Sequence, residues 1–183
     1  LVIHANSVNI MHNEIHDGYY TAISVGWVWG YAYNVCYNNK VCDNLIYNIG
    51  QGWLSDMGGI YMLGNQPNTV ISGNVIHNVS ADPDEGGYGG WGIYLDEGSS
   101  YMLVEKNLAY ACGSDAYHLH YGSYNTVRNN IFARSGESQM KIVSAPDRCT
   151  PNDGGKKTVD LYNNIILTDK KTRALSYLRN TET

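Results

Sequence analysis

A six-residue pattern recurs along the chain and constrains its fold more than any other feature. An apolar residue is followed three positions later by asparagine, and a second apolar residue lies two positions after the asparagine. The asparagines are spaced by 31, 30, 33, 23 and 34 residues. A constant motif at an irregular period predicts the fixed corner of a repeating coil, with loops of variable length between corners. The stations are Ile10, Asn13 and Ile15; Val41, Asn44 and Ile46; Ile71, Asn74 and Ile76; Val104, Asn107 and Ala109; Val127, Asn130 and Phe132; and Leu161, Asn164 and Ile166.

A second stretch recurs between these corners and is typical of a β-strand. Its copies alternate with a period of two, which indicates a strand with one buried face. They read TAISVG (21–26), GGIYMLG (58–64), WGIYLDEG (91–98), DAYHLHYG (115–122) and, more weakly, QMKIVS (139–144). Asparagine suits the corner because it tolerates left-handed backbone and its amide can bond to the equivalent asparagine one coil away. The pattern predicts an all-β fold, a parallel β-helix of about six coils.

Over roughly residues 7 to 168, this arrangement resembles the right-handed parallel β-helix superfamily, whose members are mostly enzymes and binders of polysaccharide. We expect residues 1–183 to form a single domain of a longer protein. Residues 169–183, with basic side chains at 170, 171 and 173, do not fit the repeat and are expected to be a tail or an irregular last coil. Neither end carries an amphipathic capping helix, so the solenoid is expected to be uncapped and covered by flanking domains or a partner.

The composition limits the classes of partner. The net charge is −5 and only 16% of residues are charged, which argues against nucleic acid and mildly against a polyanionic polysaccharide. No stretch approaches the ~20 apolar residues of a membrane helix, so no membrane partner is expected. The chain has 16 Tyr and 4 Trp but 1 Phe. Such rings suit stacking on sugars, although Tyr also fills half-buried strand positions.

The cysteines and the first residues say little about the compartment. Cys36, Cys42, Cys112 and Cys149 show neither a CxxC pair nor a zinc spacing. Free, mostly structural thiols are therefore expected, and the redox environment stays undetermined. The chain begins at Leu1 without a basic-then-apolar signal segment, which suggests an excerpt or a processed product.

The register of the strand copies predicts which side chains face outward. Aligning Ile23, Ile60, Ile93 and Tyr117 places these residues, and those two positions later, in the core. Adjacent coils lie ~4.8 Å apart. The intervening positions then form an exposed column of Tyr61, Tyr94 and His118, with Asp96 and His120 in the neighbouring column. Aromatic rings beside a carboxylate and an imidazole predict a sugar-binding site.

Two long lead-in loops point to the same face. Residues 49–59 and 79–92 precede this strand in adjacent coils, and long insertions on a regular scaffold usually build a site. The alternative is that they are merely tolerated surface loops. The 144–157 insertion is expected to wall the far end. The residues of interest in the two lead-in loops are Trp53, Asp56, Asp82, Asp84, Glu85, Tyr88 and Trp91.

Hydrolysis of a glycosidic bond needs two carboxyl groups that flank the scissile oxygen. Asp96 is the best-placed acid, since it is expected to project from a strand beside Tyr94. Asp56 is its natural partner, one coil earlier; Glu97 has the opposite parity, but Gly98 could turn it outward. In extended chain, the offset between Asp56 and Asp96 is about 23 Å. The 49–59 loop must therefore fold back at Gly58 and Gly59; otherwise Glu97 or Asp115 is the next candidate partner.

The segments DMGGIYMLG (56–64) and GWGIYLDEGSS (90–100) resemble those of β-helical glycoside hydrolases, most closely glycoside hydrolase family 141. That family includes enzymes that act on xylan and on fucosyl linkages of pectin. The resemblance implies two catalytic aspartates on adjacent coils, Asp56 and Asp96. We expect a secreted, periplasmic or cell-surface protein whose partner is a polysaccharide or oligosaccharide. The outward column and the lead-in loops, and not the resemblance, supply the expected substrate-binding residues: Tyr61, Tyr94, His118, His120, Trp53, Trp91 and Tyr88.

Alternative functions remain open at this stage. A non-catalytic carbohydrate-binding module would use the same aromatic residues. A polysaccharide lyase would need a basic residue, with Lys141 or Arg128 as candidates. We expect no cofactor, although Asp82, Asp84 and Glu85 could bind Ca²⁺ in a lyase, and His118 and His120 could share a metal with Asp96.

Overall fold

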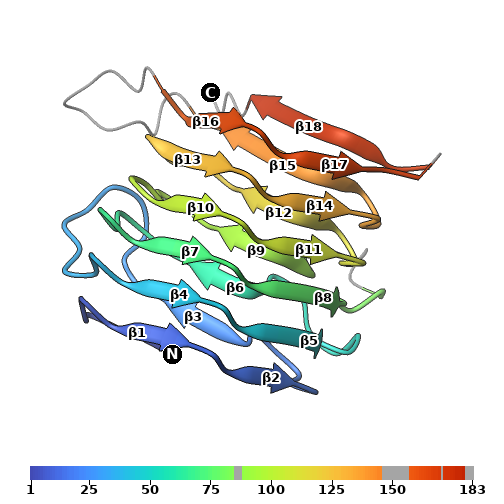
Figure 1. Ribbon diagram of the computed structural model, residues 1–183, viewed down its shortest axis with the longest axis horizontal. Helices are drawn as coiled ribbons and strands as arrows, with labels where there is room; N and C mark the ends of the chain where they lie inside the picture. Colours follow the sequence, from blue (N-terminus) through green and yellow to red (C-terminus); the bar gives the residue numbers. More distant parts are fainter. Residues whose placement is uncertain (85–87, 146–156, 170, 180–183) are drawn as a thin grey trace.

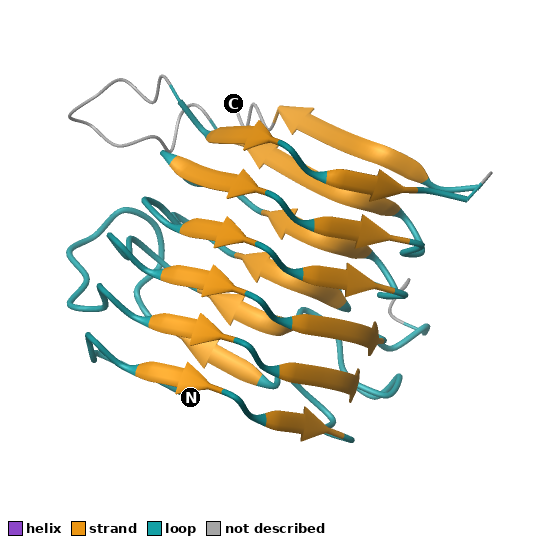
Figure 2. Cartoon of the chain, viewed as in Figure 1, coloured by secondary structure: helices purple, strands orange, loops and turns teal. Residues whose placement is uncertain are grey.

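The computed structural model describes residues 1–84, 88–145, 157–169 and 171–179, which form three parallel six-stranded sheets (Figures 1 and 2). The first sheet contains β1 (Asn9–Met11), β4 (Lys40–Cys42), β7 (Val70–Ser72), β10 (Leu103–Glu105), β13 (Asn125–Arg128) and β16 (Val159–Tyr162). The second contains β2 (Glu14–His16), β5 (Leu45–Ile49), β8 (Val75–Val79), β11 (Leu108–Tyr110), β14 (Ile131–Ala133) and β17 (Ile165–Leu167). The third contains β3 (Ile23–Val25), β6 (Gly58–Met62), β9 (Trp91–Leu95), β12 (Asp115–Leu119), β15 (Ser138–Ser144) and β18 (Arg173–Arg179).

Each coil contributes one strand to each sheet, so the predicted parallel β-helix of six coils is confirmed. The third sheet lies behind the first two in the view of Figure 1. Within the part of the chain that the structure describes, no helix is long and apolar enough to cross a membrane.

A ladder of asparagine side chains runs between the first and second sheets. The Nδ2 atom of each ladder residue donates to the Oδ1 atom of the next, at 2.9–3.0 Å, from Asn13 to Asn164. Each Oδ1 atom also accepts the backbone N–H of the preceding ladder residue. The predicted hydrogen bonding between coils is therefore present at every step.

The predicted reason for asparagine at this corner was partly wrong. The left-handed backbone belongs to the residue before each ladder asparagine and not to the asparagine itself. The ladder residue occupies its position because its amide bonds both along the stack and to a backbone carbonyl. The residues with positive φ are His12, Asp43, Gly73, Lys106, Asn129 and Asn163.

The core lies between the three sheets and follows the predicted register. Ile23 pairs with Ile60, Ile60 with Ile93, and Ile93 with Tyr117. All four side chains are buried in one apolar cluster, as are the residues two positions later. Burial of one apolar face per strand explains why the period-two pattern located this sheet correctly.

The last coil is more regular than expected. Residues 173–179, predicted as part of a tail or irregular coil, form β18 and pair in parallel with β15. The hydrophobic side chains of this coil are more exposed than their equivalents in the middle of the stack. Ile165 is 61% exposed and Ile166 is 37% exposed, whereas Ile76 and Phe132 are fully buried.

Candidate active site

The third sheet carries the predicted column of outward-facing residues. Tyr61 pairs with Tyr94, Tyr94 with His118, and His118 with Lys141. The column is not exposed as predicted, because Tyr94 and His118 are only 1% and 5% exposed. Trp91 covers both, with ring centroids 4.2 Å from Tyr94 and 4.4 Å from His118. These buried rings therefore lie beneath the surface of the site, and their faces are not open to a ligand.

Asp96 lies immediately after β9 and is held from both neighbouring coils. The Tyr61 hydroxyl donates to Asp96 Oδ2 at 2.6 Å, and His120 Nδ1 lies 2.9 Å from Asp96 Oδ1. Asp96 is 6% exposed. Burial raises the pKa of this carboxyl, but the hydrogen bonds from His120, Tyr61 and Tyr94 outweigh burial, and the net shift is downward. Asp96 is therefore held as a carboxylate.

Asp56 lies in the lead-in loop, two residues before β6, and its backbone is left-handed with φ of 54°. The Tyr94 hydroxyl donates to Asp56 Oδ1 at 3.3 Å, and the Tyr20 hydroxyl donates to the Asp56 carbonyl oxygen at 3.1 Å. The residue as a whole is exposed. Partial desolvation, followed by the negative charge of Asp96, raises the pKa of the Asp56 carboxyl.

The side chain of Tyr94 closes the predicted gap between the two aspartates. The loop does not fold back at Gly58 and Gly59, because both belong to β6. A side chain at Gly58 would lie 3.0 Å from Tyr94 Cβ, so the absence of one leaves room for the Tyr94 ring. The Tyr94 hydroxyl hydrogen-bonds to Asp56 and also reaches Asp96. Because one hydroxyl contacts both aspartates, the nearest oxygens of the two carboxyl groups lie within about 7 Å of each other.

The other candidate acids are engaged by other side chains. Glu97 accepts a hydrogen bond from the Tyr121 hydroxyl at 2.7 Å. Asp115 is fully buried and accepts from Trp91 Nε1 at 3.0 Å and from the Ser138 N–H at 3.1 Å. The Asp115 carboxylate therefore joins β9, β12 and β15 within the sheet, and it is not placed to reach a substrate.

Two of the three predicted aromatic residues of the lead-in loops are exposed, whereas Trp91 is buried. Trp53 is 69% exposed and Tyr88 is 54% exposed. Trp53 makes an edge contact with Tyr19 at 6.2 Å, and these two residues line an apolar cleft with Leu54. Tyr88 packs edge-on against Trp91 at 5.4 Å. Trp53 and Tyr88 are thus open to a ligand, unlike the rings beneath them.

Sequence reasoning missed the loop that follows β3, residues 26–39. Its Trp27 and Trp29 are 44% and 52% exposed and contact each other edge-on at 5.5 Å. The loop backbone lies against the turn after Asp96, since a side chain at Gly98 would overlap the Gly30 carbonyl. The crowded run GWVWGYAY at 26–33 was the available signal, but strand alternation does not reveal across which coils a loop runs.

In the described part of the chain, the predicted basic residues pair with carboxylates outside the Asp56–Asp96 site, and the predicted metal ligands do not form a metal-binding cluster. Arg128 belongs to the first sheet and pairs with Glu105 at 2.7 Å, whereas Lys141 pairs with Glu137 at 3.3 Å. Among the described residues, no three His, Cys, Asp or Glu side chains are grouped to hold a metal ion. Glu85, proposed with Asp82 and Asp84 for Ca²⁺, lies outside the described residues, as do most of the 144–157 insertion and Cys149; Cys36, Cys42 and Cys112 are free and buried.

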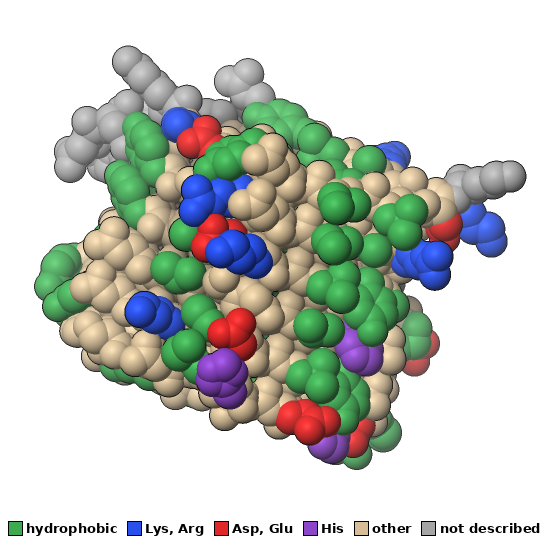
Figure 3. Space-filling view, viewed as in Figure 1, with side chains coloured by type: hydrophobic (Ala, Val, Ile, Leu, Met, Phe, Trp, Pro, Cys, Tyr) green, Lys and Arg blue, Asp and Glu red, His purple; other side chains and the backbone are tan. Residues whose placement is uncertain are grey.

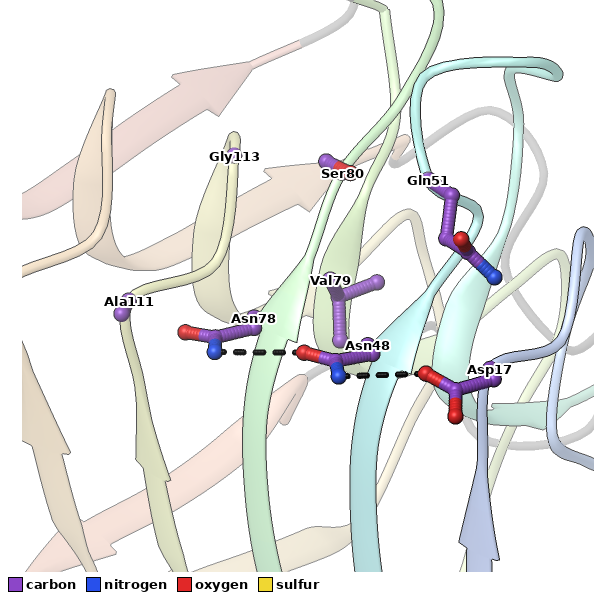
Figure 4. Close-up of a pocket in the computed structure, with 8 residues that line it drawn as sticks. All are labelled: Asp17, Asn48, Gln51, Asn78, Val79, Ser80, Ala111 and Gly113. Atoms are coloured by element: carbon purple, nitrogen blue, oxygen red, sulfur yellow. Dashed lines mark hydrogen bonds between the residues drawn. The ribbon is translucent and has the colours of Figure 1, made fainter.

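Two other surface features lie beside the second sheet. A polar hollow of about 310 Å³ contains Asp17, Asn48 and Asn78 (Figure 4). These three form a hydrogen-bonded row of left-handed corner residues, which is a structural ladder like the asparagine one. The outer face of the same sheet carries stacked aromatic and histidine rings, visible as adjoining green and purple side chains in Figure 3.

Comparison with known proteins agrees with the observed architecture. A model of the family described as the right handed beta helix region matches residues 1–166. Among solved structures, a glycoside hydrolase is similar to this chain, with a TM-score of 0.53 and 22% sequence identity. The match covers 94% of this chain and 22% of that one, so the present chain spans about a fifth of its length. At this identity the likeness shows a shared fold. No curated protein matches the chain.

Proposed function

We propose that this chain, which belongs to the right-handed β-helix family, carries the catalytic face of a glycoside hydrolase. The observation that carries the proposal is the position of the Tyr94 hydroxyl, which donates to Asp56 Oδ1 at 3.3 Å and also contributes to lowering the pKa of Asp96. It brings together two carboxyl groups from adjacent coils at a separation compatible with glycoside hydrolysis, in which the groups lie about 5 to 9.5 Å apart.

The environments of the two carboxyl groups favour opposite roles. The pKa of Asp56 is raised and that of Asp96 is lowered, so a range of pH exists in which Asp56 is protonated and Asp96 is ionised. Such a divergence is the usual signature of an acid and a base in one active site. Asp56 is exposed and can protonate the leaving-group oxygen, and Asp96 supplies the negative charge on the side of attack.

The substrate class follows from the surface around this pair. Exposed Trp53 and Tyr88 lie on the loops that lead into the site, and Trp27 and Trp29 lie beside the turn that leaves it. Aromatic faces on both sides suit an extended neutral glycan chain. The resemblance of the strand motifs to glycoside hydrolase family 141 points to xylan or fucosylated pectin, although the −5 net charge disfavours long uronate stretches.

A carbohydrate-binding module without catalysis is the second candidate. The observation in its favour is that Trp27, Trp29, Trp53 and Tyr88 are exposed on the loops next to the site, whereas the Asp96 carboxylate is only 6% exposed. Aromatic platforms serve binding and catalysis equally, so activity distinguishes the two functions.

Turnover of xylan and of fucosylated pectic oligosaccharides provides the test. Asp56→Asn and Asp96→Asn are each expected to lower turnover by about 10² to 10⁴-fold, the usual contribution of general acid–base catalysis. Both variants should retain glycan binding, measured by affinity electrophoresis or calorimetry. Asp84→Asn, in an exposed stretch of the same loop system, is the matched control and should be unaffected. Binding by the wild type without turnover would replace hydrolysis by the binding function.

A further inference from the structure

The carboxylate of Asp96 is poorly placed to contact a substrate itself. Both of its oxygens are engaged, Oδ1 by His120 and Oδ2 by Tyr61. Its side chain is 9% exposed, whereas that of His120 is 29% exposed. A nucleophilic carboxylate must bring one oxygen onto the anomeric carbon, and here that approach would require breaking a short, buried hydrogen bond. The exposed member of the pair is the imidazole.

The imidazole of His120 is held in one orientation. Its backbone N–H donates to the Leu95 carbonyl at 2.8 Å, which fixes the residue against the coil that carries Asp96. The Tyr121 ring packs edge-on against the imidazole at 5.3 Å. Because Asp96 is ionised, the contact at Nδ1 selects the tautomer with its proton on Nδ1. That tautomer leaves a lone pair on Nε2.

The second ring nitrogen is available. Within the described residues, Nε2 of His120 makes no hydrogen bond, and it is absent from the buried polar atoms that lack a partner. An unbonded polar atom that is not buried faces solvent. The neighbouring His118 differs, because it is only 5% exposed and its Nδ1 atom lies 3.4 Å from the buried Asp115.

We propose that His120 is the general base of the reaction and that Asp96 is its positioning residue. This inference rests on the proposed hydrolase function and refines it. His120 Nε2 removes one proton from a water molecule, whose oxygen forms the new bond to the anomeric carbon. The glycosidic C–O bond breaks, and its electron pair goes to the leaving oxygen, which takes the proton of Asp56. The protonated His120 and ionised Asp56 then return to their starting states by proton exchange with solvent.

This mechanism has a stereochemical consequence. A single displacement by water inverts the configuration at the anomeric carbon, whereas a nucleophilic carboxylate would retain it through a covalent glycosyl-enzyme.

The charge around the base favours the step, because Asp96 stabilises the imidazolium that forms. Among the described residues, the titratable groups near His120 include Asp96 and Asp56 from the two preceding coils, His118 in β12, and Tyr121.

The test combines kinetics with product analysis on the substrate that wild-type protein hydrolyses. His120→Ala is expected to lower kcat by about 10² to 10⁴-fold with a small change in KM, and added imidazole should restore part of the activity. Asp96→Asn should lower kcat similarly, because an amide can hold the opposite tautomer. Proton NMR of the first product should show inverted configuration. His77→Ala, which removes a surface histidine on the second sheet, is the matched control.

The outcomes separate this inference from the function on which it rests. Near-normal turnover by His120→Ala, retained configuration, or a glycosyl ester trapped on Asp96 would each overturn the dyad and leave the hydrolase intact. No hydrolysis by wild-type protein on any glycan would overturn both. The imidazole ¹⁵N shifts of His120 give a readout independent of turnover: the Nδ1-protonated tautomer is expected in wild type and lost in Asp96→Asn.

Discussion

Removing one central rung of the asparagine ladder should destabilise the protein severely. Asn74 is fully buried, and its side chain makes four hydrogen bonds. Its Nδ2 atom donates to the Val41 carbonyl and to Asn107 Oδ1, both at 2.9 Å. Its Oδ1 atom accepts from the backbone and side chain of Asn44, at 3.0 and 2.9 Å. Asn74→Ala deletes all four.

The expected loss follows from this count. At a net 0.5–1.5 kcal/mol for each hydrogen bond, four bonds amount to about 2–6 kcal/mol. Asn107 Oδ1 keeps the backbone N–H of residue 74, but the Asn44 groups and the Val41 carbonyl lose a partner away from water. The total is a large part of the roughly 5–15 kcal/mol that stabilises a typical domain.

Urea unfolding followed by far-ultraviolet circular dichroism measures this change. Asn13→Ala is the matched control, since the same substitution there removes two hydrogen bonds made by an exposed amide. Water can replace those bonds, so the control is expected to cost below about 1 kcal/mol. Equal losses in the two variants would refute the argument that buried ladder bonds, and not the asparagine corner as such, stabilise the stack.

Three further predictions concern the site. Gly58→Ala should lower the rate of glycan hydrolysis, because the new methyl group lies 3.0 Å from Tyr94 Cβ. Gly18→Ala is the control, because the nearest neighbour of its new methyl group is at 3.7 Å. Trp29→Ala should weaken oligosaccharide binding in calorimetry while leaving the thermal midpoint almost unchanged, since this indole is 52% exposed. Activity should fall as pH rises through the raised pKa of Asp56, because Asp56 then loses the proton that it donates. Activity should also fall at low pH, where Asp96 becomes protonated. A pH profile without the fall at high pH would contradict the assignment of Asp56 as the acid.

The regular part of the structure could be predicted from the sequence because each coil of a solenoid packs its side chains in the same way. Ile23, Ile60 and Ile93 occupy equivalent inward positions, and one alignment therefore fixed the register of the whole third sheet. The asparagine stations located the corner for the same reason. The left-handed residue before each asparagine was missed, because those positions hold five different residue types and no composition marks them.

The exposed residues of the site were harder to predict, because loops and neighbouring side chains determine which of them solvent can reach. Alternation showed that Tyr94 and His118 point away from the core, but it could not show that Trp91 covers both. The pairing of Asp56 with Asp96 was predicted despite an unfavourable offset along the strand. What closes the gap is the length of the Tyr94 side chain and the missing side chain at Gly58, and a distance along the backbone contains neither.

The difference between the two aspartates follows from where each lies relative to the repeat. Asp96 directly follows a regular strand and receives hydrogen bonds from the coil before it, through Tyr61, and from the coil after it, through His120. A carboxylate stacked in this way is stabilised as an anion even when buried. Asp56 lies in an irregular loop, where Tyr94 is the hydrogen-bonding side chain and Asp96 is a nearby like charge, so its protonated form is favoured. The repeat thus builds the anionic half of the site, and a departure from the repeat builds the acid.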